Sequence, residues 1–258
     1  MQLKALINKK IEITEYESVT STNIIAKQAA PLLQEDMLVI CAHQSEGRGR
    51  LGRSFYSPFC GGIYMSLCLH TSLPAQKLPL ITTAAAVAVA QTLEEAADKQ
   101  FGIKWVNDIY LDNKKVCGIL TEGVFDPVSG KPYCAVLGIG INLTAPVGGY
   151  PEKLKGIAGA VFEEERPKDK KNEIIAGIIN RFYAFYDDIQ SKPFLDDYRK
   201  RSTLDGKHIY YLKNGVKCEG EVVGIDDDFH LLVKDKNNNV HSLDSGEVTV
   251  GGANEAHN

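Results

Sequence analysis

The chain has 258 residues, 44% of them hydrophobic, and a formal net charge of -4 at pH 7. That is enough apolar material for a buried core. The acidic balance, with a pI of about 5.9, excludes a protein that binds nucleic acid or anionic membranes by its overall charge. The longest apolar stretch, residues 78–90, is too short and too rich in Ala and Thr to span a bilayer.

Cysteine usage indicates a reducing compartment. The six cysteines stand at positions 41, 60, 68, 117, 134 and 218, and none forms a C-x-x-C pair. Most lie in apolar runs such as M-S-L-C-L-H. We expect reduced core thiols of a cytosolic protein rather than disulfides or metal ligands.

Residue patterns along the first 200 positions predict an α+β organisation. Ser21 is a typical helix cap, and the apolar residues of 171–190 recur at helical spacing. Expected helices cover 21–30, 79–99, 171–190 and 193–200. Expected strands cover 37–42, 61–69, 103–106, 109–111, 116–124 and 133–143.

The pattern changes near residue 204. From there to residue 250, short alternating segments are separated by turn residues, which predicts a small β-barrel of about five strands. We therefore divide the chain into a larger α+β domain (1–203), a β-module (204–250) and a disordered tail (251–258).

A loop rich in Arg and Gly, S-E-G-R-G-R-L-G-R-S-F-Y-S-P at 45–58, allows three interpretations. It could be a solvated mobile loop, an RNA-binding segment, or a cradle for an anion. Arg48 and Arg50 are two positions apart, so an extended backbone would point both guanidinium groups to one side. Two such groups can bind a carboxylate and a phosphate together.

Two further segments carry candidate polar residues. K-W-V-N-D and K-V-C-G-I-L place Lys104, Asn107, Asp108 and Lys115 around one hairpin. A carboxylate between apolar stretches, as at Asp108, requires a cationic partner or a metal ion. The segment G-I-G-I-N-L at 138–143 is either an ordinary strand approached by another backbone or part of the same site.

Taken together, and in this order, the motifs G-R-G-R-L-G-R, K-W-V-N-D, K-V-C-G-I-L and G-I-G-I-N resemble the catalytic domain of the biotin protein ligases. S-T-N at 21–23 and Gln44 are similar to that family as well, and the terminal β-module resembles its SH3-like domain. The resemblance implies an α+β fold: a mixed-sheet catalytic domain related to the class II synthetases, followed by an SH3-like barrel.

The resemblance also implies a two-step reaction. Biotin attacks the α-phosphate of ATP to give biotinyl-5′-AMP, and a lysine of a biotin carboxyl carrier domain then takes the biotin. Catalytic roles would fall to Arg48, Lys115 and Asp108, with Asp108 a candidate Mg²⁺ ligand. Biotin would contact Ser21, Thr22, Asn23, Gln44, Gly47, Arg48, Gly49, Arg50, Lys115 and Gly118. ATP or the adenylate would contact Arg50, Arg53, Phe55, Lys104, Asn107, Asp108 and Asn142, with Phe55 in place of the family's frequent adenine-stacking tryptophan.

This chain departs from the family in two places. Val106 replaces the proline of the usual K-W-P-N-D, for which we expect a small loss of rigidity. Only 20 residues precede Ser21, too few for the winged helix-turn-helix of the repressor members, so we expect no DNA binding.

The expected protein is therefore a cytoplasmic enzyme that uses ATP, Mg²⁺ and biotin, with no bound prosthetic group and no membrane partner. We expect a monomer or a weak homodimer. Two alternatives remain at this point: a lipoate or octanoate protein ligase, and a nucleic-acid-binding module.

Overall fold

The computed structural model describes residues 2–59, 61–130, 132–164, 168–213 and 215–251. Of the predicted disordered tail (251–258), residues 252–258 lie outside the described residues, as does Cys60, whereas the Gly251 amide donates to the His208 carbonyl at 2.8 Å. No helix within the described part of the chain is both long and apolar enough to cross a membrane. The five described cysteines are free, and all but Cys218 are buried.

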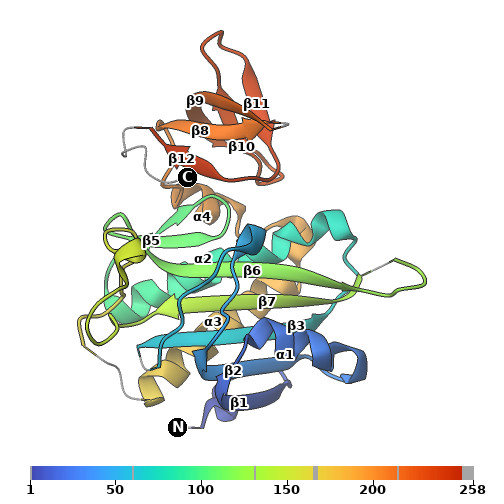
Figure 1. The fold of residues 1–258 in the computed structure, drawn as a ribbon. Coiled ribbons are helices and arrows are strands. Elements are labelled where there is room, and N and C mark those ends of the chain that lie inside the picture. The colour runs from blue at the N-terminus through green and yellow to red at the C-terminus, as the bar shows by residue number, and fades with distance from the viewer. Residues whose placement is uncertain (1, 60, 131, 165–167, 214, 252–258) are drawn as a thin grey trace.

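A seven-stranded sheet forms the larger part of the molecule (Figure 1). Its strand order is β1-β2-β3-β7-β6-β5-β4, and only the β1–β2 pair is parallel, so the predicted mixed sheet is confirmed. The strands are β1 (Glu12–Val19), β2 (Met37–Gln44), β3 (Gly62–His70), β4 (Gly102–Lys104), β5 (Asp108–Leu111), β6 (Lys114–Phe125) and β7 (Pro132–Asn142).

Helices cover the two faces of this sheet because successive strand residues point to opposite sides. Leu38 and Leu67 belong to the core that contains α2 (Pro79–Ala97) and α3 (Lys168–Tyr186). Their neighbours Val39 and Cys68 pack on the other face with Ala26 of α1 (Thr22–Ala29). The expected helices at 21–30, 79–99 and 171–190 are thus present, with ends that differ by up to four residues.

The terminal module is a five-stranded antiparallel sheet of order β11-β10-β9-β8-β12. Its strands are β8 (His208–Lys213), β9 (Val216–Ile225), β10 (Leu231–Lys234), β11 (Val240–Leu243) and β12 (Val248–Val250). The predicted number of strands is confirmed. Among the described residues, no pairing joins β11 to β12, so closure into a barrel is not part of the observed ladder.

The connector between the two sheets is anchored to the edge of the larger one. After α4 (Leu195–Lys200), the Arg201 carbonyl accepts the Ile103 amide at 2.7 Å, and the Thr203 amide donates to the Ile103 carbonyl at 3.0 Å. This segment covers the free side of β4. Figure 1 shows that the module consequently lies beside the end of the sheet formed by β4 and β5.

Two further hydrogen bonds hold the strand end beyond β4. The Trp105 indole donates to the Phe229 carbonyl of the module at 2.8 Å, and the Tyr198 hydroxyl of α4 donates to the Val106 carbonyl at 3.0 Å. The Trp105–Val106 peptide bond is cis. The backbone that leads into Asn107 and Asp108 is therefore fixed by both α4 and the module.

We predict that Arg201→Met destabilises the protein by about 3 kcal/mol or more. The Arg201 side chain is only 13% exposed, pairs with both carboxylate oxygens of Glu94, and donates from Nε to Asp197 at 3.0 Å. Its loss leaves two carboxylates without their cation at the connector. Urea unfolding measures the change.

Lys155→Met serves as the control, because the Lys155–Glu152 pair is exposed and should contribute less than about 1 kcal/mol. Equal destabilisation by the two substitutions would contradict the role assigned to Arg201.

Candidate functional site

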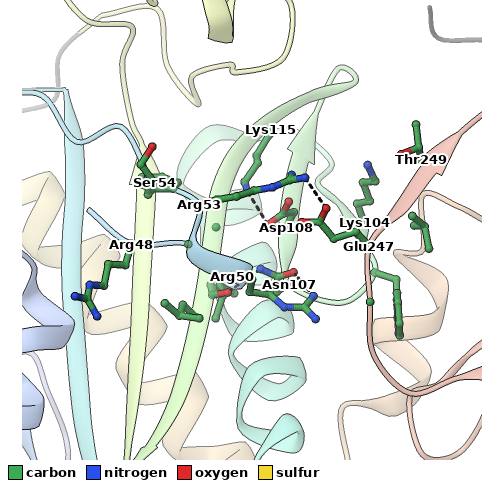
Figure 2. Close-up of a pocket in the computed structure, with 18 residues that line it drawn as sticks. Arg48, Arg50, Arg53, Ser54, Lys104, Asn107, Asp108, Lys115, Glu247 and Thr249 are labelled. Carbon is green, nitrogen blue, oxygen red and sulfur yellow. Dashed lines mark hydrogen bonds and ion pairs between the residues drawn. The ribbon is translucent and has the colours of Figure 1, made fainter. Parts of the chain in front are cut away.

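A pocket of about 230 Å³ lies where the Arg/Gly segment, the β4–β6 hairpins and the terminal module meet (Figure 2). It contains the charged residues that sequence analysis singled out, from segments far apart in the chain. The polar and charged lining residues are Arg48, Arg50, Arg53, Ser54, Lys104, Asn107, Asp108, Lys115, Glu247 and Thr249. Five cations face two carboxylates in this lining, so the pocket favours an anion.

The Arg/Gly segment is a tight hairpin. The Gly49 amide donates to the Arg53 carbonyl at 2.7 Å, and the Phe55 amide donates to the Gly47 carbonyl at 2.8 Å. The tip is a 3-10 turn, η3 (Arg50–Gly52), in which Leu51 and Gly52 have φ values of 53° and 77°. Glycine at position 52 accommodates that backbone without a Cβ penalty.

The prediction that Arg48 and Arg50 point to the same side is wrong. Arg50 begins the 3-10 turn, so the alternation of an extended backbone stops before it. Figure 2 shows the two guanidinium groups directed apart. Arg50 donates to the Asn107 side-chain oxygen at 3.2 Å, whereas Arg48 lies between this pocket and a second, smaller one.

Asp108 and Lys115 form an ion pair at the centre of the charged pocket. Lys115 Nζ lies 2.8 Å from Asp108 Oδ1. That oxygen is buried, and none of the described groups meets it with hydrogen-bond geometry. The contact is therefore electrostatic, and the oxygen retains the capacity to accept a proton or a hydrogen bond.

Lys104 lies on the same wall of the pocket. Burial lowers the pKa of Lys104 below its ordinary value, and the neighbouring Lys115 and Arg53 lower it further, while Asp108 and Glu247 oppose the shift. An anionic ligand bound beside Lys104 would offset the repulsion among these neighbouring cations.

The smaller pocket, about 20 Å³, adjoins the first and is lined by four uncharged hydrogen-bonding side chains together with apolar side chains, glycines and Arg48. Gln44 accepts the Thr22 amide hydrogen at 2.9 Å through Oε1 and donates through Nε2 to Ser57 at 2.8 Å. Ser21 is 1% exposed and makes no cap hydrogen bond with the helix it precedes. The side chains of Ser21, Thr22, Asn23 and Gln44 are thus brought together as predicted.

Phe55 separates the two pockets and lines both. A Cβ at Gly118 would lie 3.2 Å from its ring, and one at Gly140 would overlap it. The two glycines therefore make room for an aromatic ring against β6 and β7. Stacking of this ring on an adenine remains a prediction.

Two predicted site residues lie elsewhere. The Asn142 side chain donates to the Gly159 carbonyl at 3.1 Å and lines neither pocket. Gly47 also lines neither; a Cβ there would overlap the Phe55 carbonyl and crowd Ser57 Oγ at 2.7 Å. Their assigned contacts with ligands are still predictions.

Two groups of residues at the site were not predicted from the sequence. Gly246, Glu247, Val248 and Thr249 of the module line the charged pocket, and Glu247 pairs with Arg53. Nothing in the local sequence marks them. Glu122, which pairs with Lys27 beside the smaller pocket, did have a signal, because a carboxylate in the apolar run V-C-G-I-L-T-E-G-V requires a partner.

The residues present do not fit a resident Mg²⁺ site. Within the described ranges, no three His, Cys, Asp or Glu side chains gather to hold a metal ion. Asp108 is already paired with an ammonium group, and Glu247 is paired with Arg53. Mg²⁺ prefers phosphate oxygens and water in such sites, so it would enter with a nucleotide rather than be held beforehand.

Comparisons with known proteins find relatives of this chain. The profile of the Biotin/lipoate A/B protein ligase family matches residues 15–142. Bifunctional ligase/repressor BirA of Bacillus subtilis is 32% identical over 240 residues, 88% of this chain and 69% of that protein. Biotin--[acetyl-CoA-carboxylase] ligase of Paracoccus denitrificans is 30% identical over 225 residues, 83% of this chain and 90% of that protein.

Solved structures share the fold. The biotin protein ligase from Aquifex aeolicus in complex with biotin and ATP superposes with a TM-score of 0.76 at 24% identity, covering 93% of this chain and 98% of that one. The similarity extends over both sheets, so the architecture of the two parts is that of the biotin protein ligases.

We predict that Gly140→Ala loosens the Arg/Gly hairpin, because the new methyl group overlaps the Phe55 ring. Overpacking of this kind costs about 1–3 kcal/mol, so tryptic cleavage at Arg48, Arg50 and Arg53 should become about fivefold faster or more. Mass spectrometry of timed digests locates the cuts.

In a Phe55→Ala background, the same Gly140→Ala change should add nothing, because the ring that it overlaps is gone. An equal acceleration in both backgrounds would show that the methyl group acts on the hairpin by another route.

Proposed function

The chain belongs to the Biotin/lipoate A/B protein ligase family, and we propose that it is a biotin protein ligase. It activates biotin with ATP to biotinyl-5′-AMP and transfers the biotin to a lysine of a biotin carboxyl carrier domain. One observation carries this assignment: a small pocket with four uncharged hydrogen-bonding side chains and an apolar lining adjoins a cationic pocket, and Arg48 lines both.

In the first step, a biotin carboxylate oxygen attacks the α-phosphorus of ATP and the bond to the β-phosphate oxygen breaks, releasing pyrophosphate. The reacting groups are both anionic, so catalysis consists mainly of holding them together and stabilising charge. Arg48, at the junction of the pockets, and Lys115 supply that positive charge. Arg50, Arg53 and Lys104 would hold the remaining phosphates.

In the second step, the carrier lysine attacks the biotinyl carbonyl carbon and AMP leaves. The amine must first lose a proton. Asp108 Oδ1, buried and 2.8 Å from the Lys115 ammonium, is the candidate acceptor once Lys115 has turned to the ligand. Departure of the phosphates also frees Lys115 to return to Asp108.

The terminal module completes the nucleotide pocket in this proposal. Its residues Gly246–Thr249 form one wall, and Glu247 holds Arg53. The chain divides into a catalytic part (1–203) and the module (204–250), and the active pocket lies between the two parts. MgATP is the co-substrate, and the enzyme acts in the cytoplasm as a monomer or weak homodimer without binding DNA.

Purified protein with Mg²⁺, ATP and labelled pyrophosphate should exchange label only when biotin is added. Lipoate should not substitute, because it has no N–H groups to match the amide and hydroxyl groups around Thr22 and Gln44. Exchange with lipoate instead would keep the adenylation chemistry and overturn the substrate. Lack of exchange with either acid would overturn the assignment, and oligonucleotide binding would be measured next.

Lys115→Met should lower the rate of exchange about 100-fold or more at saturating substrates, the loss typical for a donor that stabilises developing charge. Lys114→Met is the matched control: the adjacent side chain is exposed and lines neither pocket, so its rate should stay within about twofold. Similar losses in both variants would indicate damage to β6 rather than loss of a catalytic group.

A further inference from the structure

Strand β6 contains a β-bulge next to Lys115. Ile109 of β5 pairs with Cys117, but the following residue, Tyr110, pairs with Lys115, so Val116 is an extra residue in β6. Bulges are common beside active sites, where they change the direction of a side chain. The direction of Lys115 therefore depends on this irregularity and not on the ordinary alternation of a strand.

The extra residue places Lys115 on the face of the sheet that forms the pocket. An unbroken register would put Lys115 opposite Leu111, which is 8% exposed and belongs to the core. With the bulge, Val116 and Cys117 both lie in that core, each 0% exposed. Lys115 is left on the other face, where its Nζ lies 2.8 Å from Asp108 Oδ1 (Figure 2).

The segment 157–159 holds the backbone of Lys115 on the side away from β5. β7 pairs with β6 only from Cys117 onward. Before that point, the Lys115 amide donates to the Ile157 carbonyl at 2.8 Å, and the Gly159 amide donates to the Lys115 carbonyl at 2.9 Å. Both backbone groups of Lys115 on this side are thus bonded to a loop segment that takes the place of β7.

Tyr150 fixes this segment through the Gly159 carbonyl. The Tyr150 hydroxyl donates to that oxygen at 2.7 Å, and the Asn142 side chain donates to the same oxygen at 3.1 Å. A carbonyl has no hydrogen to give, so each contact has only one possible direction. Burial raises the pKa of Tyr150 to about 12, so the hydroxyl keeps its proton at neutral pH. Tyr150 itself lines neither pocket.

We propose that Tyr150 is a positioning residue: through the Gly159 carbonyl it holds the bulged backbone of β6 and so keeps the Lys115 ammonium group in its place in the pocket. The inference rests on the proposed function, in which Lys115 stabilises the charge of the reacting carboxylate and phosphate. A displacement of this group by about 1 Å is enough to slow such a reaction strongly. Tyr150 would therefore affect the rate without contact with either substrate.

Tyr150→Phe removes the hydroxyl and leaves the Gly159 carbonyl its bond from Asn142, so the variant should fold. In biotin-dependent pyrophosphate exchange, its kcat should fall about tenfold. The KM values for biotin and ATP should stay within about twofold, because the groups that bind the ground state remain.

Tyr186→Phe is the matched control. It also removes a tyrosine hydroxyl that donates to a backbone carbonyl, that of His70 at 3.3 Å, and Tyr186 lines neither pocket. Its kcat should stay within about twofold of the wild type.

Amide hydrogen exchange measures the positioning without reference to activity. The amides of Lys115 and Gly159, which join the strand to the loop segment, should exchange about tenfold faster in Tyr150→Phe. The Ile119 amide, which donates to the Asn107 carbonyl at 3.1 Å, should exchange as in the wild type.

A Lys115→Met background separates positioning of this ammonium group from general damage. Once the group is gone, Tyr150→Phe should change kcat by less than about twofold, because nothing is left to position.

The outcomes separate the two claims. A wild type without biotin-dependent exchange would overturn the proposed function and this inference with it. Where the wild type does exchange, an unchanged kcat in Tyr150→Phe would overturn this inference alone. A tenfold loss that persists in the Lys115→Met background, or a loss confined to KM, would also overturn it, because the hydroxyl would then act on another group or on a substrate.

Discussion

The hydrogen bond from the Trp105 indole to the Phe229 carbonyl joins the segment after β4, which lines the pocket, to the terminal module. It holds the Trp105 ring in the core that the larger sheet and the module share and, with the Tyr198 bond to Val106, leaves the following two residues little freedom. Asn107 is then held by a bond from its side chain to the Ile119 carbonyl at 2.8 Å. Asp108 follows directly, so the position of its carboxylate depends on contacts made by the residues before it.

The pocket depends equally on the absence of side chains at three glycines of β6 and β7. Gly118, Gly138 and Gly140 carry no side chain on the face toward the hairpin, and the space is filled by Lys115, the Asn23 amide and the Phe55 ring. The Phe55 ring stands between the smaller pocket and the charged pocket. A ligand that occupies both pockets must therefore displace this ring or pack along it. Until the ring moves, the smaller pocket, of about 20 Å³, has room for roughly one water molecule.

An acidic protein can present a cationic site because field strength depends on local arrangement rather than on net charge. The chain carries -4 overall, yet five cations converge on one pocket. Their mutual repulsion is moderated by two carboxylates: Asp108 against Lys115, and Glu247 against Arg53. The second pair crosses between the two sheets and ties the hairpin to the module. The phosphates of a ligand would compete with the two carboxylates for the same cations. Ligand binding can therefore break either ion pair.

The sequence alone determined the chemistry of the site and most of the secondary structure, because residue type, order and periodicity are properties of the covalent chain. The motifs picked out residues that the fold brings together around the two pockets, apart from Gly47 and Asn142, and the strands from Met37 onward followed from their apolar runs. β1 was not predicted, since E-I-T-E-Y-E-S-V is mostly polar and is held as an edge strand by its pairing with β2. The predicted orientation of the Arg50 side chain was wrong because a 3-10 turn interrupts the expected extended backbone. Only the tertiary structure decided which charges meet: Glu247 reaches Arg53 across 194 positions, and Glu122 reaches Asn23 across 99. Such pairs depend on how sheets and helices pack, and no local pattern encodes that packing.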